Sequence, residues 1–117
     1  MIGKYPVVHL IGPTMGREER FREVERELTL RGYIVFSPVV YDRPTYDEHP
    51  DMLNDMCYMK LLMCDQCVVV ATDHIGQSTR LRMSQAFEMK KRVYWYNWNT
   101  KHFELLSSIQ ELEAYIK

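Results

Sequence analysis

The hydrophobic and polar positions of this chain alternate between short apolar runs and longer amphipathic segments. The apolar runs lack polar alternation, which is typical of strands buried on both faces of a parallel sheet. The predicted strands are Tyr5–Ile11, Tyr33–Phe36, Gln66–Ala71 and Val93–Tyr96. The segments between them carry apolar residues at helical spacing. The predicted helices are Arg17–Arg31, Asp51–Met63, Ser78–Arg92 and a last helix that follows Thr100 and ends near Ile116.

Strands that alternate with helices at this spacing predict βαβ units with right-handed crossovers. The fold class is therefore α/β with a parallel sheet. In such sheets the ligand binds beyond the carboxyl ends of the strands, where the strand order reverses. Three segments should meet there: 12–16, 37–50 and 73–79.

Length and composition are those of one ordinary globular domain over residues 1–117, with 46% hydrophobic and 26% charged residues. The formal net charge of −1 argues against a nucleic-acid polymer or a membrane surface as the partner. No apolar run approaches the roughly 20 residues that span a bilayer. Three cysteines without a secretory signal favour reduced thiols and a cytoplasmic location.

Two turns suggest an anion site. Gly12-Pro13-Thr14-Met15-Gly16 follows the first strand, and it is not a P-loop because no Gly-Lys-Ser/Thr follows. Ser78 is the predicted N-cap of the helix that follows the third strand. Helix N-termini present backbone N–H groups to anions. Together the two turns predict a site of nucleotide size.

Other chemistry-bearing residues receive structural interpretations. Cys64 and Cys67 match C-x-x-C, but they lie at a helix end that leads into a strand, so we expect buried thiols. The histidines form no i,i+4 pair, and we expect neither a metal nor a cofactor. His9 should point into the core, whereas His49 and His74 lie in predicted rim loops, where they either contact a ligand or are solvated.

Four segments, taken in order, resemble the nucleoside 2-deoxyribosyltransferase-like superfamily: His9–Gly16, Gly32–Pro38, Cys64–Val70 and Ile75–Arg80. Within it the chain resembles the small bacterial and phage branch, which is similar to deoxynucleoside 5′-monophosphate N-hydrolases. The resemblance implies a flavodoxin-like three-layer sandwich with a parallel sheet of four to five strands. It also implies a nucleoside or nucleotide as ligand and a homodimer or higher homo-oligomer.

The resemblance also implies site residues. The first loop would hold sugar or phosphate, and the turn before the fourth predicted helix would hold phosphate. The implied binding residues are Gly12, Pro13, Thr14, Gly16, Ser78 and Thr79. The family attacks the anomeric carbon with a helix glutamate, and counting back four residues from Ala86 places Arg82 at that position. Arg82 lies one turn beyond Ser78 on the same helix face, so its guanidinium could reach the anion.

Three functions stay open from the sequence. The first is a nucleotide-binding domain that does not cleave its ligand, which Arg82 favours. The second is an active N-glycosidase or deoxyribosyltransferase that uses another carboxylate, with Asp55, Asp73 and Asp51 as candidates. The third is a structural or interaction protein whose exposed tyrosines and tryptophans contact a partner.

Overall fold

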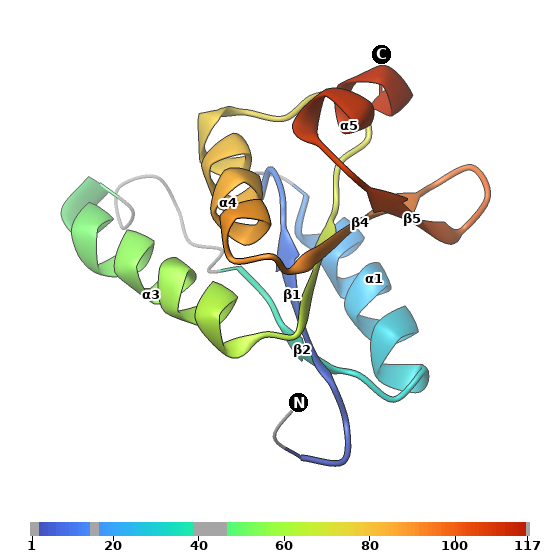
Figure 1. The fold of residues 1–117 in the computed structure, drawn as a ribbon, viewed down its shortest axis with the longest axis horizontal. Helices are drawn as coiled ribbons and strands as arrows, with labels where there is room; N and C mark the ends of the chain where they lie inside the picture. The colour runs from blue at the N-terminus through green and yellow to red at the C-terminus, as the bar shows by residue number, and fades with distance from the viewer. Residues whose placement is uncertain (1–2, 15–16, 39–46, 117) are drawn as a thin grey trace.

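The structure, a computed structural model, describes residues 3–14, 17–38 and 47–116. Its sheet has the strand order β2-β1-β3-β4-β5 (Figure 1). The strands are β1 (Val7–Ile11), β2 (Ile34–Phe36), β3 (Gln66–Val69), β4 (Arg92–Asn97) and β5 (His102–Leu106). The helices are α1 (Glu18–Leu30), α3 (Pro50–Met63), α4 (Gln77–Glu88) and α5 (Ile109–Ile116). Strands β1 to β4 pair in parallel, which confirms the predicted α/β class, and β5 pairs antiparallel to β4.

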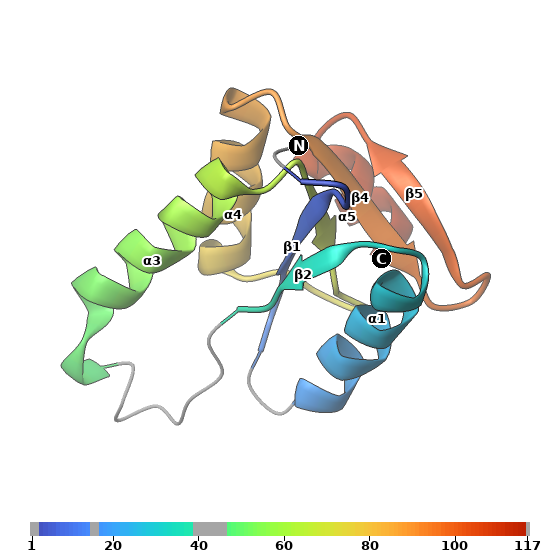
Figure 2. The same cartoon turned by 90° about the horizontal axis from the view of Figure 1, so that it is seen from below.

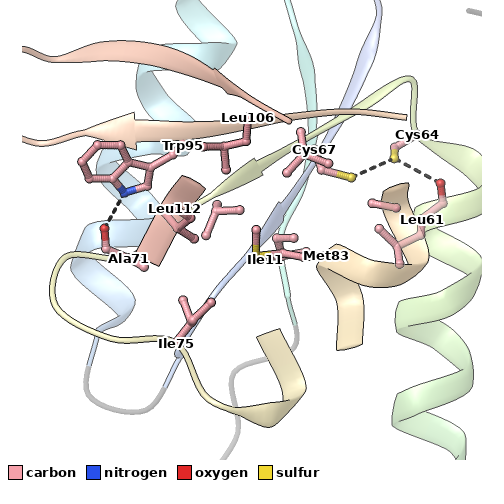
Figure 3. Packing of buried hydrophobic residues seen from close by; sticks show 13 residues of the cluster. Ile11, Leu61, Cys64, Cys67, Ala71, Ile75, Met83, Trp95, Leu106 and Leu112 are labelled. Carbon is pink, nitrogen blue, oxygen red and sulfur yellow. Dashed lines mark hydrogen bonds between the residues drawn. The ribbon is translucent and has the colours of Figure 1, made fainter. Parts of the chain in front are cut away.

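The molecule has three layers because successive side chains of β1 point to opposite faces of the sheet. Val8 and Leu10 pack with Phe21 and Val24 of α1 on one face. The other face packs against α3, α4 and α5, and Ile11 lies there (Figures 2 and 3). This arrangement agrees with the predicted three-layer, flavodoxin-like sandwich.

The apolar cluster on the α3–α4–α5 side includes the predicted buried thiols. Cys64 and Cys67 are 2% and 0% exposed, and their Sγ atoms lie 3.8 Å apart (Figure 3). The Cys64 thiol also donates to the carbonyl of Leu61 at 3.1 Å. Both cysteines are free, so the prediction of buried thiols is confirmed. In the same cluster, the indole N–H of Trp95 donates to the carbonyl of Ala71 at 2.8 Å.

The prediction of one long last helix was wrong in its first half. Residues His102–Leu106 form β5, and only Ile109–Ile116 is helical. Asn97 explains the change of direction, because its side-chain oxygen accepts bonds from the backbone N–H groups of Asn99 and Thr100. The chain therefore turns back along β4 as a hairpin before α5 begins.

The predicted N-cap of α4 was also misplaced. The helix begins at Gln77 with Gly76 as its N-cap, and Ser78 is the second helical residue. Among the described residues no helix is long and apolar enough to cross a membrane.

Gly12 leaves β1 with a φ of +151°, and it passes directly over the backbone of Val70. A Cβ at this position would overlap the carbonyl oxygen of Val70. Ordinary L-residues also avoid this φ, so only glycine satisfies both conditions. The close approach allows the chain to turn from β1 over the end of β3.

We predict that Gly12→Ala lowers the free energy of unfolding by about 2 kcal/mol or more, because it combines backbone strain with a backbone clash. Urea unfolding measures the change. Gly3→Ala is the matched control, because a Cβ at Gly3 meets nothing within 4 Å. Equal stabilities of the two variants would contradict the proposed packing of Gly12.

Candidate functional site

A cleft of about 650 Å³ opens beyond the carboxyl ends of β1 and β3. The strand order reverses here, because β2 and β3 lie on opposite sides of β1. Its wall contains the loop after β1, the segment that leads into α3, and the turn and first helical residues of α4. These belong to the three segments that the parallel topology predicts to meet.

The predicted binding residues that the structure describes all line this cleft. They are Gly12, Pro13, Thr14, Ser78, Thr79 and Arg82. The predicted residue Gly16 lies outside the described residues. Their contact with a ligand stays a prediction.

Arg82 lies in the wall between α3 and α4 and is only 8% exposed. Its guanidinium donates to the side-chain oxygen of Asn54 on α3. It also donates to the side-chain oxygen of Gln85 at 3.0 Å. Arg82 therefore braces the two helices against each other. A guanidinium has more N–H donors than these two bonds use, so a ligand in the cleft could accept another.

The cleft has a second cation that sequence reasoning missed. Arg17 begins the first predicted helix and was not selected as a site residue, but it lines the cleft, and its guanidinium lies 3.8 Å from the carboxylate of Asp73. Its position directly after the 12–16 turn was the available signal. The backbone of Gly76 and Gln77 adds the N-terminal end of α4, where no described side chain caps the helix. These groups together make one wall of the cleft suitable for an anion.

His9 lines the cleft from β1 while it is only 1% exposed. Its Nδ1 atom lies 3.0 Å from the carbonyl oxygen of Phe36. Burial, together with the nearby cations Lys60 and Arg82, lowers the pKa of His9 from 6.5 to about 4, against the opposing effect of the Phe36 bond. The ring is therefore neutral at physiological pH, as a buried core histidine should be.

None of the three predicted carboxylates lies among the residues that line the cleft. Asp51 and Asp55 are exposed on α3, because the helix turns Leu53, Asn54 and Cys57 toward the cleft instead.

Asp73 is exposed at the turn before α4, where His74 holds the pKa of its carboxyl below the usual range. His74 lines the cleft, whereas His49 does not contribute to the described lining.

Among the described lining residues the carboxylate is Asp47, which sequence reasoning did not select. Its signal was weak, because it falls in an aperiodic loop. Within the described ranges, no three His, Cys, Asp or Glu side chains gather as a metal site would require.

Comparisons with known proteins show the fold. No protein-family model matches the chain, and no curated protein matches it. A solved structure does: the CMP N-glycosidase BcmB of Clostridium botulinum, with a TM-score of 0.57 and 18% sequence identity. The match covers 93% of this chain and 99% of that chain. The chain thus has the fold of an enzyme that acts on a nucleoside monophosphate.

The buried neutral state of His9 predicts that stability depends on pH. The unfolded chain takes up this proton near pH 6.5, and the folded chain takes it up only near pH 4. The contribution of neutral His9 to the free energy of unfolding is therefore complete above about pH 6.5. It is lost as the pH falls toward 4, and the total loss is about 3 kcal/mol.

Urea unfolding at several pH values tests this dependence. His9→Asn should flatten the curve between these pH values, because it removes the titrating ring. The exposed His102 offers a control, and His102→Asn should leave the curve unchanged. A His9→Asn curve as steep as that of the unmodified protein would contradict the prediction.

Proposed function

We propose that this protein binds a nucleoside 5′-monophosphate in the cleft and does not cleave it. The observation that carries the proposal is the joining of two cationic side chains, Arg17 and Arg82, with the N-terminus of α4 and the Gly12 loop around one cleft. Phosphate binding at a helix N-terminus beside arginine is favoured by both hydrogen bonding and charge. The volume of about 650 Å³ is within the range of small-molecule sites.

The residue at position 82 is the reason to propose that the bound nucleotide is not cleaved. A glycosidase of the retaining type attacks the anomeric carbon with a carboxylate. The family that the chain resembles supplies that group from this place on its helix, and here the place holds a buried arginine bonded to Asn54 and Gln85. A guanidinium can hold a phosphate, but it has no carboxylate oxygen that could attack the anomeric carbon.

Cleavage of the N-glycosidic bond is the second candidate function, and Asp47 favours it. Its carboxylate belongs to the described lining of the cleft, and the structural relative is named a CMP N-glycosidase. Asp55, Asp73 and Asp51 receive no comparable support from their positions. If cleavage occurs, we propose Asp47 as its carboxylate.

We predict that CMP, dCMP, UMP and AMP raise the melting temperature of the protein, whereas the matching nucleosides at equal concentration raise it less. Binding to the folded state alone stabilises a protein by mass action. Arg82→Ala should reduce the ligand-induced shift, with about tenfold weaker binding, because a charged hydrogen bond is lost. Arg80→Ala is the matched control, because Arg80 lies on the same helix and pairs with Glu113 at 2.8 Å.

The same incubations should be analysed for free base by chromatography. Ligand-induced stabilisation without base release supports binding alone. Base release that Asp47→Asn abolishes would replace the first proposal by the second. If no nucleotide shifts the melting temperature and no base appears, both are wrong.

We also propose that the protein is a homodimer whose two copies meet through α3. One face of this helix carries a stripe of four methionines at the four-three-four spacing of a helix–helix seam. They are 46–60% exposed: Met52, Met56, Met59 and Met63. The stripe lies opposite the buried face that contains Leu61. Figure 2 shows α3 along one side of the molecule, with α4 on its inner side.

Charge and symmetry favour a second copy as the occupant of this stripe. The N-terminal half of α3 carries the exposed carboxylates Asp51 and Asp55. At its C-terminal end Lys91 donates to the carbonyl of Cys64 at 2.6 Å, and Lys90 and Arg92 flank it. An antiparallel, two-fold pair places the acidic end of one helix beside the basic end of the other, and it brings the methionine stripes into register.

We predict a dimer mass by light scattering after gel filtration. The double variant Met56→Glu/Met59→Glu should be monomeric, because it places charges in the centre of the seam. Leu30→Glu/Leu105→Glu is the matched control, since both leucines are exposed elsewhere on the surface. A monomeric unmodified protein at high concentration would overturn the proposal, as would a dimer of the first variant.

A further inference from the structure

His9 lies at the bottom of the cleft wall formed by β1. Residues of β1 alternate between the two faces, and Val7 and Ile11 belong with the cluster on the α3–α4–α5 side. His9 therefore points to that side, between the helices that Arg82 and Asn54 join. It precedes Gly12 by three residues, which is about 10 Å along a strand. In the proposed function the phosphate binds at the loop after β1. His9 therefore lies beside the nucleoside part of the ligand rather than beside the phosphate.

The contact with β2 defines which ring nitrogen carries the proton. The carbonyl oxygen of Phe36 can only accept, so Nδ1 must donate its proton across the 3.0 Å that separates them. In a neutral imidazole the other nitrogen, Nε2, then carries a lone pair and no proton. Nε2 is a hydrogen-bond acceptor.

The polar groups around His9 leave this acceptor unused. Lys60 donates to the carbonyl of Ser37 at 2.8 Å, and Arg82 donates to Asn54 and Gln85. In the part of the chain that the structure describes, no group forms a hydrogen bond with Nε2 of His9. His9 is also one of the residues that line the cleft, although it is only 1% exposed.

We propose that Nε2 of His9 accepts a hydrogen bond from a neutral donor on the nucleoside part of the ligand, and thereby selects nucleotides that carry this donor. The proposal rests on the proposed nucleotide-binding function. Buried acceptors are nearly always satisfied in folded proteins, and here the ligand completes the set. A ligand with an oxygen acceptor at the same place binds more weakly, because two acceptors then face each other without a proton.

We assign the donor to one of two groups: the exocyclic amine of cytosine or the 2′-hydroxyl of ribose. Pairs of probes distinguish them. CMP and UMP differ in an amine against a carbonyl, and CMP and dCMP differ in the 2′-hydroxyl. If the base amine meets His9, CMP binds at least about tenfold more tightly than UMP. If the hydroxyl meets it, CMP binds more tightly than dCMP by a similar factor. Equal affinities in both pairs overturn the proposal.

Two variants of His9 separate the roles of its nitrogens. The amide of His9→Asn reaches as far as Nδ1, so it can keep the bond to Phe36 but has no acceptor at Nε2. The amide of His9→Gln reaches as far as Nε2, so it restores an acceptor there. Calorimetric titration should show the preference between the paired probes lost in His9→Asn and largely kept in His9→Gln. Loss or retention in both variants contradicts the assignment to Nε2, provided that each variant melts cooperatively.

Nitrogen-15 spectra of the histidine ring provide a readout that does not depend on substitution. The unliganded protein should show His9 with its proton on Nδ1 at neutral pH, and CMP should shift the Nε2 resonance. If the backbone signals of residues 76–79 respond to CMP but Nε2 does not, nucleotide binding stands and the role of His9 is wrong. If neither responds, the proposed function fails and the role of His9 fails with it.

Discussion

The close passage of Gly12 over the backbone of Val70 is the constraint on which the cleft depends. Val70 donates its N–H to Ile11 at 2.8 Å, so β1 and the end of β3 stay joined up to the point where the chain turns away. A side chain at Gly12 would separate the two segments. Without this contact, the loop after β1 and the N-terminus of α4 would not border the same space.

The charges in the cleft follow from what surrounds them. Arg82 is nearly buried, and burying a charge is costly unless it is paired or hydrogen-bonded. Asn54 and Gln85 satisfy it without neutralising it, so the cleft keeps a positive charge. Burial keeps His9 neutral, and the positive charges of Lys60 and Arg82 add to this effect.

The fold was predictable wherever the local pattern matched one environment. The apolar runs that became β1 and β3 are buried on both faces, and few arrangements other than a parallel sheet accept such runs. The segment at β5 was not predictable in the same way. Phe103 and Leu106 fit a helix as well as a strand, and the hairpin depends on Asn97 bonding to the turn behind it. The strand His102–Leu106 is then held by its antiparallel pairing with β4, a contact that the local pattern does not contain.

By itself, the sequence determined the class of the fold, the edge of the sheet where the cleft lies, and the arginine at position 82. Those properties follow from periodicity and order along the chain. The tertiary structure decided which side chains reach the cleft. Asp47 and Arg17 line it and Asp55 does not. The physical reason is that side-chain direction depends on the rotation of each helix about its axis, and packing of the whole core determines that rotation.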